Sequence, residues 1–519
     1  MPLQRRAQVP LERPLRITLN TQSKRIHHAD QFLSIRVSRP CRRQEFLHRF
    51  FKPARFHKVA GCFDFSPNRA CEHGCTCQNK PMNRLFHILA LCIALPASAA
   101  DVPRPLTDDD FIAFDPEKAK IGQLLFYDKI LSGNRNISCG TCHHHDLGGS
   151  DGLSLGIGEG GEGVGPERHA GTGPDRIEKR IPRNAPALWN LGAKDIDVLF
   201  HDGRLSVSDI FGNGFNSPAE EWLPEGLETI LAAQALFPLT ARFEMAGAPR
   251  ENEVGGAIND RIDNAWPIIT LAVRTNPDYG LMFVKAFDDI NKPEDVEIVD
   301  IANALAAFMG TEWKNHDSPF DLFLAGDDTA LTPAAKNGME LFYGDAGCAS
   351  CHSSPLMSDQ KFHALALPAF GPGKTRRFDL QPRDVGRMGE SDRLEDAYRF
   401  RTPMLRNVAL TAPYGHNGAY PTLEGIVRHH LDPRTALDQW TRDQARLPSV
   451  PWLARADFAV QYQHREIARQ RAKIDITPRD LSDNDIADLV AFLESLTGKT
   501  ARNLPLGRPE TVPSGLTVD

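Results

Sequence analysis

Two Cys-x-x-Cys-His segments are the parts of this 519-residue chain whose residue types and spacing point most directly to chemistry. They read Cys139-Gly140-Thr141-Cys142-His143 and Cys348-Ala349-Ser350-Cys351-His352. In such a segment two thiols add to the vinyl groups of one haem, and the adjacent histidine binds the iron from one face. A zinc ribbon would need all four thiols close together, whereas these two pairs lie far apart in the chain. The sequence therefore predicts two covalently attached c-type haems.

The segments that must position these motifs repeat each other. Asp115-Pro116 and Thr332-Pro333 each offer a helix N-cap residue followed by proline at the first helical position. Each start leads through a Leu-Phe-Tyr stretch, ending at Tyr127 or Tyr343, into a haem motif. Both halves close with an apolar-periodic helix that begins with Asp-Ile-Ala, and strand signals are sparse. We predict a mainly α fold of two cytochrome c-like domains, each with one covalently bound haem.

The repeat also predicts the domain boundaries. An N-terminal cytochrome c-like domain would span 101–316, a linker 317–329, a C-terminal cytochrome c-like domain 330–500 and a tail 501–519. A hydrophobic content of 41% in 519 residues is enough for two or three cores. The net charge of -7 gives no indication of nucleic acid or an anionic membrane as a partner.

The segment Met82–Ala100 reads as a secretory signal peptide. It has a basic start, an apolar stretch, Pro96 and small residues at the cleavage site, and it is too short for a comfortable membrane span. Residues 1–81 carry 16 Lys/Arg against 5 Asp/Glu, and we interpret them as a misplaced start outside the mature protein. A Cys/His metal site around Cys71–Cys77 is the alternative, although its spacing matches no zinc pattern well. Export predicts a periplasmic protein that does not span the membrane.

Several further stretches resemble the bacterial di-haem cytochrome c peroxidases and the related MauG enzymes. The similarity runs from about residue 105 to about residue 500 and is carried, in order, by Gly148-Gly149-Ser150-Asp151-Gly152, Arg183-Asn184-Ala185-Pro186, Phe200-His201-Asp202-Gly203-Arg204, Phe243-Glu244-Met245, Arg401-Thr402-Pro403-Met404-Leu405-Arg406-Asn407-Val408 and Thr411-Ala412-Pro413-Tyr414-Gly415-His416-Asn417-Gly418. The resemblance implies an enzyme in which the first haem reacts with hydrogen peroxide and the second transfers electrons.

The resemblance also implies a second axial ligand for the C-terminal haem, whose iron His352 binds from the other face. In the family a methionine or tyrosine lies 19 residues after the threonine of a Thr-x-Pro-Tyr motif. Counting from Thr411 reaches His430, with His429 as the neighbouring alternative. Two histidine ligands would make this haem low-spin, with a lower potential than a histidine and methionine pair.

For the N-terminal haem, bound by His143, the resemblance places the acid/base glutamate at Glu244. Gln234 and Pro238, ten and six residues earlier, would complete the peroxide pocket. A carboxylate with a raised pKa can move the proton that cleavage of the O–O bond requires. Some relatives carry a distal histidine in the loop after Asp151, but none occurs here before His169. We therefore expect an open, five-coordinate iron, with His169 as the weaker alternative in which a histidine closes the site.

One position departs from the family pattern. In the family a tryptophan normally lies between the haems, and this chain has His201 at that position. Because imidazole carries an oxidising charge less readily than indole, the charge would move through Trp189 or directly between the haems. The family's calcium ion would fall on Asn184 and the carbonyl groups of Thr411 and Pro413.

Two classes of function remain open from the sequence. The first is a di-haem peroxidase, which either takes electrons from a small cytochrome c or cupredoxin or oxidises a partner protein, often at tryptophan, as MauG and MbnH enzymes do. The second is a non-catalytic electron carrier with two low-spin haems. Glu244 and the absence of a histidine in the loop 152–168 favour the enzyme, and within that class we expect the MauG-like reaction. The sequence does not indicate the oligomeric state.

Overall fold

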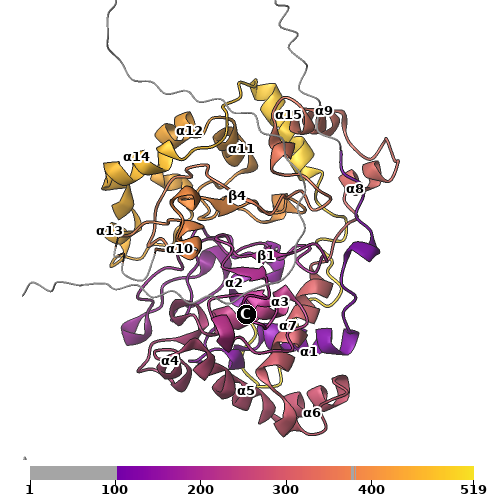
Figure 1. Ribbon diagram of the computed structural model, residues 1–519, viewed down its shortest axis with the longest axis vertical. Coiled ribbons are helices and arrows are strands. Elements are labelled where there is room, and N and C mark those ends of the chain that lie inside the picture. The colour runs from indigo at the N-terminus through magenta and orange to yellow at the C-terminus, as the bar shows by residue number, and fades with distance from the viewer. Residues whose placement is uncertain (1–101, 376–378, 380) are drawn as a thin grey trace, which may run out of the picture. The chain divides into compact units, whose positions relative to one another are not determined.

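The computed structural model describes residues 102–375, 379 and 381–519. The predicted signal peptide and the proposed misplaced start lie outside these residues. Helices dominate the described chain, in agreement with the mainly α prediction (Figure 1). The helices before the expected linker are α1 Pro116–Tyr127, α2 Cys139–Cys142, α3 Ile230–Leu239, α4 Glu253–Ala257, α5 Trp266–Arg274, α6 Pro277–Ala286 and α7 Ile298–Glu312.

The later helices begin inside the segment expected to be a linker. They are α8 Pro319–Leu324, α9 Pro333–Tyr343, α10 Met388–Ser391, α11 Leu423–Leu431, α12 Pro433–Gln439, α13 Ala454–Asp457, α14 His464–Ala472 and α15 Asp483–Glu494. Ser318 caps α8 by accepting a hydrogen bond from the Asp321 backbone N–H, and Phe320 is fully buried. The segment 317–329 is therefore a folded connection that takes part in a core.

The repeat seen in the sequence corresponds to two equivalent helix pairs, α1 with α7 and α9 with α15. Asp115 caps α1 through the backbone N–H groups of Glu117 and Lys118, and Thr332 caps α9 in the same way. Gly122 of α1 lies against the Ala304 carbonyl, and Gly338 of α9 lies against the Asp488 carbonyl. A Cβ atom at either glycine would overlap that backbone oxygen, so both pairs need glycine for their close approach.

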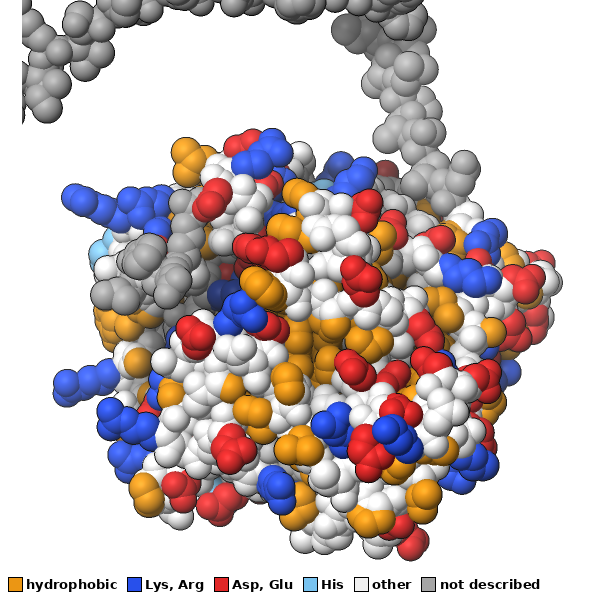
Figure 2. Space-filling view, turned by 60° about the horizontal axis from the view of Figure 1, so that its bottom comes forward, with side chains coloured by type: hydrophobic (Ala, Val, Ile, Leu, Met, Phe, Trp, Pro, Cys, Tyr) orange, Lys and Arg blue, Asp and Glu red, His pale blue; other side chains and the backbone are white. Residues whose placement is uncertain are grey.

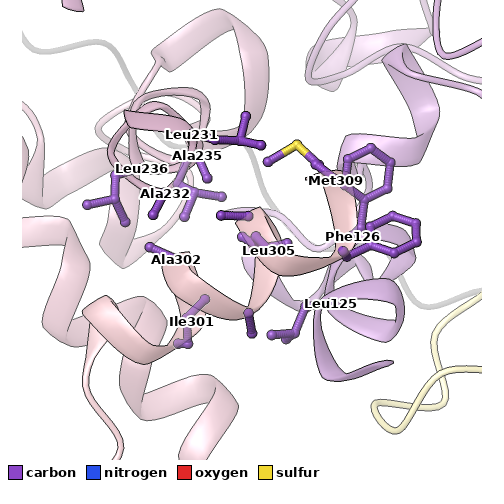
Figure 3. Close-up of a cluster of buried hydrophobic side chains, with 14 of the residues drawn as sticks. Leu125, Phe126, Leu231, Ala232, Ala235, Leu236, Ile301, Ala302, Leu305 and Met309 are labelled. Carbon is purple, nitrogen blue, oxygen red and sulfur yellow. The ribbon is translucent and has the colours of Figure 1, made fainter. Parts of the chain in front are cut away.

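Each helix pair belongs to its own hydrophobic core. In the first core, side chains of α1, α3 and α7 point toward one another (Figure 3); the labelled members are Leu125, Phe126, Leu231, Ala232, Ala235, Leu236, Ile301, Ala302, Leu305 and Met309. The second core is built by α9, α11 and α15 together with Phe320. Tail residues Ala501 and Val512 return to the first core, so the end of the described chain packs on the half where it began.

Two small antiparallel sheets lie between the helices. The first has the order β1 Val198–Leu199, β2 Leu205–Val207 and β3 Phe215–Asn216, and the second pairs β4 Phe362–His363 with β5 Phe400–Arg401. His201 lies in the turn between β1 and β2 and accepts, through its backbone oxygen, a 2.8 Å hydrogen bond from the Arg401 N–H. The two sheets thus bring the stretches around His201 and Arg401 together.

The exposed surface mixes charges of both signs. On the face shown in Figure 2, acidic and basic side chains alternate with hydrophobic ones and do not form a patch of one sign. Throughout residues 102–375 and 381–519, every helix is too short or too polar to cross a bilayer.

Candidate active site

The histidines of both Cys-x-x-Cys-His motifs are held in the same way. His143 Nδ1 lies 2.9 Å from the Gly149 carbonyl oxygen, and His352 Nδ1 lies 3.1 Å from the Met357 carbonyl oxygen. A neutral imidazole that donates from Nδ1 leaves Nε2 unprotonated and free to bind a metal. The four motif cysteines form no disulfide. Both motifs therefore present the two thiols and one imidazole nitrogen that haem attachment requires.

A cavity of about 650 Å³ adjoins the second motif. Cys348, Cys351 and His352 line it, and His430 of α11 lies on its wall as well. The rings of His352 and His430 have centroids 6.3 Å apart and planes inclined by 56°. With metal–nitrogen bonds of about 2 Å, two imidazoles on opposite sides of one iron would have ring centres about 6 Å apart. The cavity and this spacing fit a haem held between the two histidines.

The neighbouring histidines of α11 differ in what their ring nitrogens do. His430 Nδ1 lies 2.8 Å from the Ile426 carbonyl oxygen, which leaves Nε2 available. His429 is fully buried, and both of its nitrogens are engaged, Nδ1 with the Tyr420 hydroxyl and Nε2 with the Leu365 carbonyl, each at 2.8 Å. The geometry favours His430 over His429 as a ligand because only His430 has a free nitrogen beside the cavity.

The elements expected around the first motif also lie together. Among the residues of α3, Gln234 and Pro238 alone are partly exposed, and they lie four positions apart on one helical face. The chain then turns through a short π-helical segment, Arg242–Ala246, that carries Glu244. Burial raises the pKa of the Glu244 carboxyl, while the positive charges of Arg204 and Lys374 oppose this shift. Gly133, in the segment that leads into the first motif, donates a 2.9 Å hydrogen bond from its backbone N–H to the Met245 carbonyl oxygen, so the π-helical segment packs beside that segment.

The glycine-rich loop after the first motif packs against this π-helical segment. Glu159 N–H donates a 3.0 Å hydrogen bond to the Glu244 carbonyl, and Gly158 is in contact with the Phe243 carbonyl. Arg168 is buried and donates to the carbonyl oxygens of Ile157, Gly158 and Gly163. The sequence analysis missed Arg168, since its role depends on three carbonyl groups that no local pattern reveals.

No histidine ring of the described residues packs on His143 in the way that His430 packs on His352. His169, the alternative considered from the sequence, has a side chain 57% exposed at the surface and pairs with Glu162 at 3.6 Å. It is too exposed to serve as a ligand of a buried iron. Within the described residues, a second imidazole therefore faces the motif histidine at the second motif but not at the first.

Trp189 and His201, the two residues that could carry charge, both lie on the wall of the cavity. Trp189 Nε1 donates a 3.0 Å hydrogen bond to the Gly148 carbonyl, next to Gly149, which holds His143. His201 Nε2 lies 3.2 Å from the Asn184 carbonyl oxygen, and burial, with the positive charge of Arg183, lowers its pKa to about 4. His201 is therefore a neutral imidazole at neutral pH.

The expected calcium ligands Asn184, Thr411 and Pro413 lie on the wall of the same cavity. Asn184 Nδ2 donates to the Leu153 carbonyl oxygen at 2.8 Å, so the amide oxygen is the atom left for a cation. All three oxygens are neutral, which gives a weaker site than one with carboxylates.

Comparisons with known proteins agree with these motifs. The profile of the family described as di-haem cytochrome c peroxidase matches residues 116–329. The methylamine utilization protein MauG of Methylorubrum extorquens is 28% identical over 389 residues, covering 74% of this chain and 80% of its own. The cytochrome c551 peroxidase of Pseudomonas aeruginosa is 28% identical over 426 residues, covering 80% and 92% respectively. Over most of its described length the chain is therefore similar to proteins of the di-haem cytochrome c peroxidase and MauG superfamily.

A solved structure of this superfamily gives the same result. A MauG-like protein associated with microbial copper homeostasis superposes with a TM-score of 0.50 and 27% identity, covering 80% of this chain and 99% of that one. These similarities support the interpretation of the protein as a di-haem oxidoreductase of the peroxidase and MauG type. The sequence-based recognition of the family is thereby confirmed.

Proposed function

We propose that the mature protein is an exported di-haem c-type enzyme of two cytochrome c-like domains, each carrying one haem. Cys139, Cys142 and His143 would hold the first haem, at the site where hydrogen peroxide would be used. Cys348, Cys351, His352 and His430 would hold the second haem. Bound haem supplies the change of iron oxidation state that the reaction needs. The single observation that carries this proposal is the placement of His430 across the cavity from His352, with no equivalent imidazole beside His143 within the described residues.

Glu244 would hold and move the proton in the first site. Its carboxyl is buried in the π-helical segment next to the partly exposed face of α3 that carries Gln234 and Pro238. A raised pKa brings a carboxyl closer to neutral pH, where it can accept a proton from peroxide and return it to the leaving oxygen. Gln234 and Pro238 would shape the space in which peroxide binds.

Trp189 would carry charge between the two sites in place of the missing tryptophan at His201. It is the indole that touches both, since it lines the cavity of the second motif and bonds to the loop that holds His143. The neutral imidazole of His201 is harder to oxidise than an indole, so His201 would serve mainly as a packing residue of the cavity wall. Asn184, Thr411 and Pro413 would bind calcium there, and we assign this ion no chemical step.

Of the two activities in the superfamily, we propose the MauG-like one, in which a partner protein is oxidised, often at tryptophan. Two histidine ligands lower the potential of the second haem, so its oxidised states are easier to reach than with methionine. Two oxidisable centres can together store two equivalents, which suits stepwise oxidation of a side chain too large to enter a buried pocket. The alternative is peroxide reduction with electrons from a small cytochrome c or a cupredoxin.

The test is to add hydrogen peroxide to the fully ferric, haem-loaded protein and record both haem spectra. A MauG-like enzyme changes both spectra at once and then modifies a partner protein. A protein that stays inert until one haem is reduced, and then turns over with reduced cytochrome c, is an ordinary cytochrome c peroxidase. Intact mass after denaturation should show two covalent haems, and a mature N-terminus near Ala100 should confirm export.

A further inference from the structure

Tyr127, the last residue of α1, lies directly against the first haem motif. It is fully buried, and its ring fills the space beside Gly140, between the two motif cysteines; a Cβ atom at Gly140 would overlap the tyrosine ring. Its hydroxyl lies 3.2 Å from His145 Nδ1. When the neutral imidazole carries its proton on Nε2, the phenol donates this hydrogen bond and His145 accepts it.

A buried carboxyl completes the group. Glu312, at the end of α7, is 0% exposed and has one oxygen 3.7 Å from His145 Nδ1. Its two oxygens accept 2.8 Å hydrogen bonds from the backbone N–H groups of Leu506 and Gly507. Burial raises the pKa of the Glu312 carboxyl, and these two hydrogen bonds oppose that shift. The tail therefore fixes a carboxyl beside the imidazole, where it can face an imidazolium formed there.

The other half of the molecule provides a contrast. Tyr343 ends α9 as Tyr127 ends α1, and it too is buried next to a haem motif. Its hydroxyl, however, has no hydrogen-bond partner among the described residues. Of the two equivalent tyrosines, the one beside the open first site alone has a base to take its proton.

We propose that Tyr127 is an oxidation site for the first haem, with His145 as its proton acceptor. One electron leaves the phenol for the haem site that hydrogen peroxide has oxidised, and the phenolic proton moves to His145 Nδ1. The O–H bond breaks, an N–H bond forms, and a neutral tyrosyl radical remains beside an imidazolium that faces Glu312. This step rests on the proposed function, because peroxide is the oxidant that starts it. When no partner protein is present, the oxidising equivalent therefore moves to the Tyr127 side chain.

Trp313 is the competing side chain in this cluster. Its ring is fully buried and lies 6.5 Å from that of His145, but its Nε1 has no hydrogen-bond acceptor among the described residues. Because its N–H proton has no acceptor, this indole would keep a positive charge when oxidised, in a poorly hydrated place, which is unfavourable. The hydrogen bond to His145 therefore selects Tyr127.

The experiment mixes the ferric, haem-loaded protein with hydrogen peroxide in the absence of partner protein, freezes it, and records its EPR spectrum. A narrow radical signal should form whose splitting collapses when ring-deuterated tyrosine is incorporated. Tyr127→Phe should abolish the signal, and the matched control Tyr343→Phe should leave it intact. His145→Gln, which removes the base, should slow radical formation roughly 100-fold.

A second measurement on the unmodified protein covers the case in which Tyr127→Phe does not bind haem. High-field EPR should give the g-values of a tyrosyl radical with a hydrogen bond, as Tyr127 has to His145 and Tyr343 does not. Haem spectra that respond to peroxide without a tyrosyl signal, or with the signal of a tryptophan or of a tyrosyl radical without a hydrogen bond, would overturn this inference alone. Haem spectra that ignore peroxide would overturn the proposed function and this inference with it.

Discussion

The two haem motifs are alike on one side and different on the other. On the near side, each histidine is held through Nδ1 by a backbone carbonyl of the loop that follows it. On the far side, α11 brings His430 to the second motif, whereas the first motif has α3 and the π-helical segment with Glu244 nearby. In the proposed enzyme, the two copies of the motif would therefore acquire different roles through the remote segments that approach them.

Of the variants that test this difference, replacement of Glu244 should cause the largest change, in the rate of reaction with peroxide. Because a general acid/base contributes roughly 100- to 10,000-fold, Glu244→Gln should slow the reaction with peroxide by that range while haem attachment stays normal. Stopped-flow spectra measure this rate. Since burial raises the pKa of Glu244, the rate in the unmodified protein should fall as the pH drops through that raised pKa, and the variant should lose this dependence.

The matched control for this variant is Glu178→Gln. Glu178 is an exposed glutamate that pairs with Arg242 of the same π-helical segment at 2.7 Å. It should react with peroxide at the normal rate. A normal rate in Glu244→Gln would assign proton transfer to another group.

Replacing His430 should make the second site resemble the first. His430→Ala removes one of the two imidazoles, so the second haem should change from low-spin to high-spin in the ferric EPR spectrum. His429→Ala removes the neighbour whose nitrogens already have partners, and its spectrum should stay low-spin. A low-spin second haem in His430→Ala would show that another residue binds the iron.

Gly122 and Gly338 test whether the two helix pairs are packed equally closely. Gly122→Ala and Gly338→Ala each force a Cβ atom onto a backbone oxygen of the partner helix, so each should lower the free energy of unfolding by about 1–3 kcal/mol. Urea unfolding of the haem-loaded variants measures this. Gly256→Ala, whose nearest neighbour would be 3.5 Å away, is the control. Unequal losses would mean that one helix pair can relax.

Restoring an indole at His201 should produce the smallest effect. His201→Trp offers charge a second route beside Trp189, and we expect the two haem spectra to respond to peroxide together at a rate only a few times higher. Trp189→Phe should slow this coupling, because it removes the indole that contacts both sites. A slower response in His201→Trp would show that the larger ring disturbs the cavity wall.

Much of this protein could be predicted from local pattern. The capping residues Asp115 and Thr332 mark helices that begin where expected. The two Cys-x-x-Cys-His motifs predict haem attachment from their residue types alone. The segment 317–329 was harder to predict: its proline and its polar ends resemble a linker, yet Phe320 is buried in the second core. Local rules describe what a segment can form but not what will cover it.

His429 and His430 show where pattern ends. They are adjacent and chemically identical, and a helix turns each residue about 100° from the last, so their rings leave α11 in different directions. One ring enters a pocket that satisfies both nitrogens, and the other reaches the cavity with one nitrogen free. Tyr127, His145 and Glu312 likewise come from three separate segments, and the tail completes their hydrogen bonds. Residue type and spacing specify the chemistry that a side chain offers, but its partners depend on how distant segments pack, because contacts across the fold are not encoded in any one stretch of chain.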